Sequence, residues 1–309
     1  MADILVTGGA GFIGSHLVEE LAAGGSSVRV LDNLSTGTLA NLNRVRDQVE
    51  FLEGDLRDRD ILRQAVRGVR MIFHQAAFVS VPGSMKDPGL CLDVNVSGTQ
   101  NLLQIASQEG VRRVVLASSS AVYGGNEQIP LSEEQPPDLL SPYAASKRVT
   151  EIYAELFNRA AGLEVLALRY FNVFGPRQSA ESDYAAVIPI FIRKLLAGER
   201  PVIYGDGGQS RDFIFVQDVV RANLRAAAAD PLPHRVYNVC SGREISLHDL
   251  LEMLNELVPG GQDPIYQAPR EGDIYRSVGD PARARKELDF QARVEMIDGL
   301  AETIRWMRG

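Results

Sequence analysis

The feature that most constrains the fold is the stretch VTGGAGFIGS near the N-terminus, which follows an apolar run at residues 4–7. It places Gly8, Gly11 and Gly14 in GxxGxxG spacing, ahead of a helical pattern at residues 12–23. In such a turn the first glycine allows the tight bend, the second lets the backbone approach a pyrophosphate, and the third lets helix and strand pack closely. The helix start adds free N–H groups and a positive dipole end. The stretch therefore predicts a strand–turn–helix unit that binds a dinucleotide.

Polar and small residues follow the next expected strands. Asp32 ends the apolar run at residues 28–32, where a carboxylate would bind the adenosine ribose hydroxyls and repel a 2′-phosphate. This position favours NAD over NADP. Asp55 follows the third run, near where an adenine would lie, and Ala76 and Ala77 follow the fourth, where the backbone must pass close to a cofactor.

Short apolar runs alternate with helical patterns over the first part of the chain. Strands are expected at residues 4–7, 28–32, 49–53, 71–74, 114–118 and 164–169, and helices at 12–23, 58–66, 88–108 and 142–161. Strands rich in Val, Ile and Leu that alternate with helices predict βαβ units. The fold class is therefore α/β, with a Rossmann-type doubly wound parallel sheet.

The character of the chain changes after RYFNVFGPRQ, where connections lengthen and Pro and Gly become frequent. We expect residues 1–172 to form the NAD-binding domain and residues 173–309 a smaller mixed α/β substrate domain. A helix and a short strand expected within residues 212–241 would pack back on the first domain.

The stretch SPYAASKRV places Tyr143 and Lys147 four residues apart, behind a Ser141 N-cap and Pro142 at the first helical position. The two side chains then share one helix face. A tyrosine with its usual pKa of about 10 is a poor base at neutral pH. A nearby ammonium and a positive nicotinamide ring would lower that pKa. Three serines in VVLASSSAVYG are expected at the carboxyl edge of the sheet, where ligands bind, so the pattern predicts proton transfer at an alcohol beside a nicotinamide.

Charge and composition exclude several other classes. The chain has 32 basic and 40 acidic residues, a net charge of −8, so its field repels nucleic acid and anionic lipid, and neither is expected as a partner. No apolar run reaches the about 18 residues of a membrane span, and the N-terminus lacks a signal-peptide pattern. A cytoplasmic protein is expected. The four histidines and two cysteines follow no metal-binding spacing, so no metal is expected.

The motifs TGGAGFIGS, DN, GDLRD, HQAA, SSSAVYG, YAASK and RYFNVFGP, in this order, resemble the extended short-chain dehydrogenase/reductase family over nearly the whole chain. The strongest likeness is to nucleotide-sugar 4-epimerases, the UDP-glucose or UDP-N-acetylglucosamine 4-epimerases. The resemblance implies that Tyr143 is the catalytic base, Lys147 its partner and Ser119 the catalytic serine. It also implies an NAD-dependent inversion at the sugar C4 through a transient 4-keto sugar.

The resemblance carries further roles over to this chain. The implied cofactor-binding residues are Gly8, Gly11, Phe12, Ile13, Gly14, Asp32, Asn33, Ser35, Thr36, Gly37, Asp55, Leu56, Gln75, Ala76, Ala77, Asn95, Ser118, Tyr143, Lys147 and Tyr170. The implied substrate-binding residues are Ser80, Ser119, Tyr143, Asn172, Val187, Tyr204, Arg211, Arg270, Asp273 and Ser277. Two arginines can grip phosphate oxygens bidentately, which an acidic protein needs in order to bind UDP.

The resemblance also assigns the choice of sugar to Ser277, beside the 2-substituent. A tyrosine there restricts the pocket to UDP-glucose and UDP-galactose, whereas a small residue leaves room for an N-acetyl group. We therefore expect interconversion of UDP-GlcNAc and UDP-GalNAc, of UDP-glucose and UDP-galactose, or of both pairs.

Alternatives remain at this point. A 4,6-dehydratase needs an Asp-Glu pair directly after the catalytic serine, where this chain has Ser120 and Ala121. A UDP-glucuronate 4-epimerase or decarboxylase is closer, because Arg177 could read a carboxylate. A non-catalytic NAD-binding sensor often lacks the Tyr or Lys. Apolar stripes on helices 88–108 and 142–161, which form a four-helix dimer contact in the family, lead us to expect a homodimer.

Overall fold

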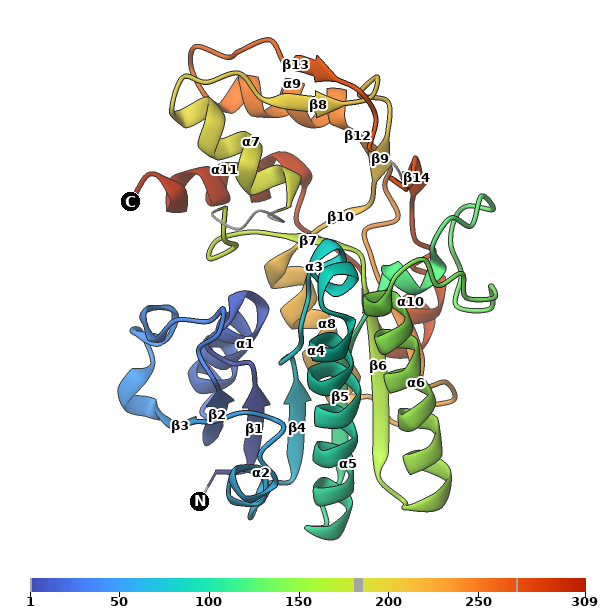
Figure 1. Ribbon diagram of the computed structural model, residues 1–309. Helices are drawn as coiled ribbons and strands as arrows, with labels where there is room; N and C mark the ends of the chain where they lie inside the picture. The colour runs from blue at the N-terminus through green and yellow to red at the C-terminus, as the bar shows by residue number, and fades with distance from the viewer. Residues whose placement is uncertain (1, 181–185, 271) are drawn as a thin grey trace.

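The computed structural model describes residues 2–180, 186–270 and 272–309 (Figure 1). Within these ranges, seven strands form one parallel sheet in the order β11-β6-β5-β4-β1-β2-β3. The strands are β1 (Ile4–Thr7), β2 (Val28–Asp32), β3 (Val49–Glu53), β4 (Met71–His74), β5 (Arg113–Ser119), β6 (Glu164–Tyr170) and β11 (Val236–Val239). Strand β1 pairs with both β2 and β4, which is the point where the strand order reverses. The predicted doubly wound parallel sheet is confirmed.

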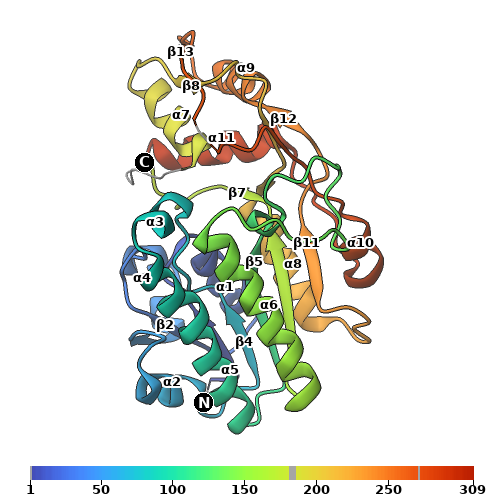
Figure 2. The same cartoon turned by 45° about the vertical axis from the view of Figure 1, so that its right-hand side comes forward.

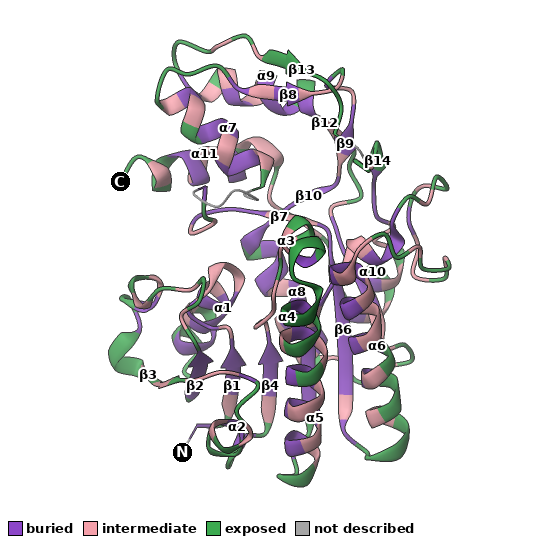
Figure 3. Ribbon diagram, in the orientation of Figure 1, coloured by how far each residue is buried: buried purple, intermediate pink, exposed green. Residues whose placement is uncertain are grey.

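Helices cover both faces of this sheet (Figures 1 and 2). Helices α1 (Phe12–Ala23) and α8 (Val216–Ala228) share a core with one face, and α2 (Arg59–Val66), α5 (Thr99–Gln108) and α6 (Pro142–Ala160) with the other. Because both faces are covered, the inner strands are mostly buried and rich in Val, Ile and Leu, whereas β3 at the edge of the sheet is partly exposed (Figure 3).

The prediction of a single helix over residues 88–108 is wrong in detail. The chain forms α4 (Pro88–Leu92), a π-helical segment (Asp93–Gly98) and then α5. Wider π-helical turns occur frequently at functional sites, and this one carries Asn95. Helix α3 (Val81–Lys86), which the sequence pattern did not indicate, precedes it.

The later elements form a second core next to the carboxyl edge of the sheet. They are β7 (Asn172–Phe174), α7 (Val187–Leu196), β8 (Val202–Tyr204), β9 (Ser210–Arg211), β10 (Phe213–Phe215), β12 (Ile245–Ser246), α9 (Leu247–Leu257), β13 (Ile265–Gln267), β14 (Arg276–Ser277) and α11 (Met296–Met307). Side chains of α7, α9 and α11 pack with Phe174 and Phe215 in this core.

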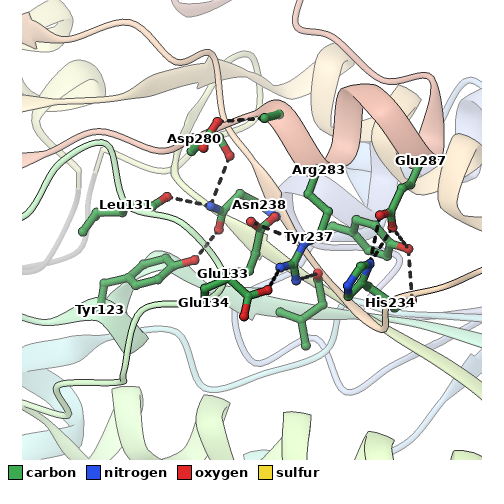
Figure 4. A network of polar contacts seen from close by, with 12 residues as sticks. Tyr123, Leu131, Glu133, Glu134, His234, Tyr237, Asn238, Asp280, Arg283 and Glu287 are labelled. Atoms are coloured by element: carbon green, nitrogen blue, oxygen red, sulfur yellow. Dashed lines mark hydrogen bonds and ion pairs between the residues drawn. The ribbon is translucent and has the colours of Figure 1, made fainter.

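Parts of the range 173–309 lie against the large sheet. Strand β11 pairs with β6, and α10 (Ala282–Leu288) packs on β11 and α8. Figure 4 shows the polar contacts that accompany this packing: the Glu287 carboxylate accepts a hydrogen bond from the Tyr237 hydroxyl at 3.0 Å. None of the helices in the described ranges is both long and apolar enough to cross a membrane.

Candidate active site

The glycine-rich turn between β1 and α1 is built for close backbone contact. Gly8 has φ of +68°, and a Cβ on Gly14 would lie 2.1 Å from the Gly8 carbonyl oxygen. Gly11 caps α1 without any side-chain acceptor, so the first N–H groups of the helix are left for a ligand. This cradle, which side chains would fill, fits a dinucleotide pyrophosphate.

Asp32 lies at the end of β2 beside this turn. Its two carboxylate oxygens accept hydrogen bonds from the Ala10 and Leu34 N–H groups at 2.9 and 2.8 Å, and burial raises its pKa. Each oxygen retains one lone pair for a ribose hydroxyl. The predicted contacts Asn33, Ser35 and Thr36 are exposed in the following loop, and Gly37 packs against Ala10.

Asp55 is joined to the same loop. The Asn33 amide donates to it at 2.8 Å, and the Arg57 guanidinium donates to both of its oxygens at 2.8 Å. These contacts hold the pKa of Asp55 well below its usual range, with the hydrogen bond from Arg57 as the largest cause. Leu56 is buried beside Gly98. The role of Arg57 could have been suspected from its spacing to Asp55.

Gln75 and Tyr170 meet at the ends of β4 and β6, although 95 residues separate them. Their side chains hydrogen-bond at 3.1 Å, and the Asn223 amide of α8 donates to the Tyr170 hydroxyl at 2.8 Å. Burial raises the pKa of Tyr170 to about 12. The backbone at Ala76, which precedes Ala77, passes close to Gly8. A Cβ built on Gly8 would lie only 2.6 Å from the Ala76 nitrogen. Nothing in the sequence singled out Asn223, since it lies within a regular amphipathic helix.

Tyr143, Lys147 and Ser119 come together where β5 ends and α6 begins. Ser141 caps α6 by accepting a hydrogen bond from the Ala144 N–H at 3.1 Å. The Ser119 side chain acts on the Tyr143 hydroxyl in the direction that lowers its pKa. The Lys147 ammonium donates to the Ala117 carbonyl at 2.8 Å and lies 5.8 Å from the Tyr143 ring centroid. The structure thus assembles the predicted Ser–Tyr–Lys group.

Burial dominates the pKa values of Tyr143 and Lys147 in the protein without its cofactor. Burial raises the pKa of Tyr143, against the lowering effect of the Ser119 side chain. Burial also lowers the pKa of Lys147 to about 8. In the protein without its cofactor, loss of water around the phenol outweighs the effect of Ser119. A cationic ring beside the phenol would act in the opposite direction. The predicted lowering of the Tyr143 pKa by Lys147 together with a positive nicotinamide ring stays a prediction.

Ser118 and Asn95 are engaged within the protein. The Ser118 hydroxyl donates to Glu151 at 2.6 Å, and Arg169 donates twice to that carboxylate at 2.8 Å. The Asn95 amide accepts from the Phe78 N–H at 2.7 Å and donates to the Ser146 hydroxyl at 2.9 Å. The contacts of Asn95 fix α6 against the segment after β4, and those of Glu151 join α6 to β5 and β6. Ser80 accepts from the Gly83 N–H at 2.9 Å and caps α3.

Four predicted substrate residues lie close together in the second core. Strands β9 and β14 pair Arg211 with Ser277, and the Arg211 guanidinium donates to Asp273 at 2.6 Å. The Asn172 amide donates to the Asp212 carbonyl at 3.1 Å. Ser277 is buried, and its small side chain lies in register with Arg211.

The other predicted substrate contacts lie in separate parts of this core. The Arg270 guanidinium stacks on the Tyr204 ring, 3.8 Å from its centroid, so this face of the ring is covered. A uracil on Tyr204 would use the other face or displace Arg270. Val187 begins α7, and the alanine at 185 in the AAVIP run lies outside the described residues.

Arg177, the position that suggested a uronate substrate, is paired with the cofactor-side helix. Its guanidinium donates to the Ser15 hydroxyl at 3.1 Å and to Glu19 at 2.5 Å. Its side chain is 10% exposed, so its charge is largely neutralised inside the protein.

The chain belongs to the NAD dependent epimerase/dehydratase family, whose model matches residues 4–240. UDP-glucose 4-epimerase of Mycolicibacterium smegmatis is 40% identical to it over 308 residues, 98% of each chain. The structure of UDP-N-acetylglucosamine 4-epimerase from Methanobrevibacter ruminantium, in complex with UDP-N-acetylmuramic acid, matches with a TM-score of 0.95 at 39% identity, covering 100% of this chain and 99% of that one. The structure of Thermus thermophilus UDP-glucose 4-epimerase with NAD matches with a TM-score of 0.89 at 39% identity, covering 99% of each chain.

Relatives with other activities also match, at lower identity. A dTDP-glucose 4,6-dehydratase from Streptomyces niveus is 34% identical over 99% of this chain and 92% of its own. UDP-glucuronate 4-epimerase of Thermodesulfobacterium geofontis is 31% identical over 100% and 97%. The predictions of the family, of an enzyme of the UDP-sugar 4-epimerase type and of NAD as its cofactor are confirmed. The identity of the sugar is a separate question.

Proposed function

We propose that this enzyme interconverts the 4-epimers of UDP-hexoses, acting on UDP-GlcNAc and UDP-GalNAc and also on UDP-glucose and UDP-galactose. The observation that carries this function is the juxtaposition of Ser119, Tyr143 and Lys147 at the carboxyl end of β5. Strand β5 is separated from the glycine cradle of β1 by β4 alone.

NAD would be held by the glycine turn and Asp32, and when bound it supplies a hydride acceptor and donor for the sugar C4. The residues of the chain handle the proton. Tyr143 takes the proton of the 4-hydroxyl group, and Ser119, whose side chain acts on the Tyr143 hydroxyl, binds the same sugar oxygen. Lys147 places a positive charge near the phenolate and so stabilises it in the buried site. After the keto sugar has turned over, Tyr143 would return the proton to the C4 oxygen, and the inverted configuration would come from return of the hydride by the bound cofactor to the opposite face of C4.

Anchoring of UDP has to persist while the sugar turns over. Arg211 and Arg270 supply the positive charge for the diphosphate in a chain with a net charge of −8. Arg211 is already oriented by Asp273, and Asn172 lies on the neighbouring strand pair. Val187, Tyr204 and Ser80 complete the proposed substrate contacts.

The small side chain of Ser277 supports an acetylated sugar. Ser277 is small and buried, in register with Arg211, so space beside the diphosphate contact depends on its side chain. A serine leaves the volume of a phenol ring for an acetamido group.

Two other activities have less support. A uronate substrate needs a cation for its carboxylate beside the sugar, whereas the Arg177 guanidinium contacts Ser15 and Glu19 of α1 rather than the proposed substrate residues of the second core. A 4,6-dehydratase needs an acid–base pair after Ser119, where Ser120 and Ala121 stand. A non-catalytic sensor would not need the Tyr143–Lys147 pair.

A homodimer is also proposed. Helix α4 exposes Leu90 and Leu92, and α6 exposes Ile152 and Leu156. Figure 3 shows that outward surfaces of both helices are exposed, and a four-helix contact would cover these side chains.

The test is to incubate the purified protein with each of the four UDP-sugars and, separately, with UDP-glucuronate, and to separate the products. Bound NAD is measured after denaturation. Epimerisation of at least one acetylated UDP-sugar is expected. Conversion of UDP-glucuronate alone, or NAD binding without any conversion, would contradict the proposed function.

A further inference from the structure

Asp212 is a fully buried carboxylate directly after Arg211. One of its oxygens accepts hydrogen bonds from the Ser241 N–H and hydroxyl, both at 2.7 Å. The other accepts from the N–H groups of Gly242 and Gly279, at 2.8 and 3.2 Å. The carboxylate therefore joins β9 to the turn after β11 and to the segment after β14.

The peptide groups of Asp212 reach two more segments. Its N–H donates to the Ser277 carbonyl at 2.8 Å. Its carbonyl accepts from the Asn172 N–H at 3.0 Å and from the Asn172 side-chain amide at 3.1 Å. Three proposed substrate residues, Asn172, Arg211 and Ser277, are thus fixed relative to one another by this one residue.

The same segment is tied to the catalytic side of the molecule. Leu131 donates its N–H to the Val278 carbonyl at 2.7 Å and accepts from the Asp280 N–H at 2.9 Å. Figure 4 shows the Asn238 amide contacting Leu131 and the Tyr123 hydroxyl, with distances of 2.8 and 2.6 Å. Leu131 lies in the connection that leads from the serines of β5 into α6, which carries Tyr143.

The approach of this segment is close. A Cβ on Gly279 would lie 2.6 Å from the Phe171 ring and 2.7 Å from the Cys240 sulfur, so only glycine fits. Gly242, whose N–H also faces the carboxylate, has φ of +75°. The backbone is shaped to bring its N–H groups to Asp212.

Stability alone does not explain a charged group here. Burial raises the pKa of Asp212 to about 6 despite its four donors. Folding therefore disfavours its ionised form at neutral pH relative to the unfolded chain. A carboxylate buried at this cost is better explained by its orienting the segments around it than by a contribution to the stability of the fold.

We infer that Asp212 is a positioning residue for the nucleotide diphosphate, which holds Arg211 and Ser277 at a set place relative to the catalytic helix. This role rests on the proposed function, because Arg211 and Ser277 are substrate residues only under that function. A merely structural role would lower stability without a selective effect on UDP binding.

The experiment compares the wild type with Asp212→Asn, by calorimetric titration with UDP and by UDP-sugar kinetics. Asparagine keeps one acceptor oxygen and turns an amide toward N–H groups that need an acceptor. UDP affinity should fall about tenfold and KM rise about tenfold, while kcat stays within about threefold. The NAD content should be unchanged.

Asp218→Asn is the matched control. Asp218 is equally buried and accepts from the Arg293 and Val294 N–H groups at 3.1 Å, but its contacts reach none of the proposed substrate residues. Ser241→Ala removes a single donor from Asp212 and should weaken UDP binding about threefold in the same direction. It serves as the decisive variant where Asp212→Asn does not fold.

Unchanged UDP affinity in folded Asp212→Asn, or in Ser241→Ala where the first variant does not fold, would overturn the inference. Equal weakening by Asp218→Asn would also overturn it. A wild type that binds UDP but epimerises no UDP-sugar would contradict the proposed function. The positioning role would then be decided by the UDP titration of Asp212→Asn alone. A wild type that does not bind UDP would contradict both.

Discussion

Tyr143 is where the chemistry of a single residue matters most. Its phenol is buried, so its pKa lies above the usual value, and the Ser119 side chain acts against this shift. A neutral phenol in this place is a poor base at pH 7. In the proposed mechanism, Lys147 and the nicotinamide of the bound cofactor supply the positive charge that favours the phenolate.

Replacing Tyr143 by Phe removes the hydroxyl and keeps the ring. We expect kcat to fall by about a thousandfold, within the range of general acid–base catalysis, while NAD stays bound. Steady-state epimerase kinetics and NAD release on denaturation measure the two effects. Tyr153→Phe, on the same helix and away from Ser119, is the control and should leave kcat unchanged. Comparable activity in the two variants would exclude Tyr143 as the base.

Ser277 gives a second prediction at the scale of one residue. Because Ser277 is buried beside Arg211, a Tyr at this position fills the space proposed for the acetamido group. For Ser277→Tyr we expect the ratio of kcat/KM for UDP-GlcNAc to that for UDP-glucose to fall at least about tenfold. Ser277→Ala should retain the wild-type ratio. A ratio unaffected by the tyrosine would place the choice of sugar elsewhere.

At the scale of elements, His74 links β4 to β1 and α5. Its ring nitrogens lie 2.7 Å from the Thr7 hydroxyl and 2.9 Å from the Thr99 hydroxyl, and burial lowers its pKa to about 3. The nearby Lys147 charge lowers that pKa further. The ring is therefore neutral in the folded protein, and Lys147 and His74 do not compete as cations.

This neutral histidine predicts a loss of stability in acid. An unfolded histidine binds a proton below about pH 6.5, whereas His74 in the folded protein does so only near pH 3. Between these values the free energy of unfolding should fall by up to about 1.4 kcal/mol per pH unit as the pH falls. Urea unfolding of the wild type and of His74→Gln between pH 4.5 and 7.5 measures it. Parallel pH profiles for the two proteins would contradict the assignment.

Sequence reasoning located most of the elements that carry the site, because local signals define them. The glycine turn, the capped start of α6 and the apolar runs of the strands depend on residues close together in the chain. It could not find the contacts made by Asn223, Glu151 and Asp212, because these form only when distant segments pack. The π-helical turn at Asp93–Gly98 was missed for a related reason, since its apolar pattern fits an ordinary helix.

At the scale of the whole molecule, the exposed apolar side chains of α4 and α6 predict a dimer. Leu156 is 52% exposed, and a glutamate there would bury a charge in the proposed four-helix contact. We expect Leu156→Glu to be a monomer by light scattering where the wild type is a dimer. Ile265→Glu changes an exposed residue of β13 and should remain a dimer. A monomeric wild type would contradict the proposed contact.

The two parts of the molecule meet where the reaction is proposed to occur. The large sheet holds the glycine cradle and the Ser119–Tyr143–Lys147 group, and the second core holds Arg211 and Ser277. Division of the chain at residue 172 stays a prediction, since β11 and α10 pack with the large sheet.

The most direct test is conversion of UDP-sugars by the purified protein, with bound NAD measured in the same sample. We expect about one NAD per chain and approach to the same equilibrium mixture from either 4-epimer, with UDP-GlcNAc and UDP-GalNAc among the substrates. A protein that carries NAD and leaves all four UDP-sugars unchanged would contradict the epimerase function.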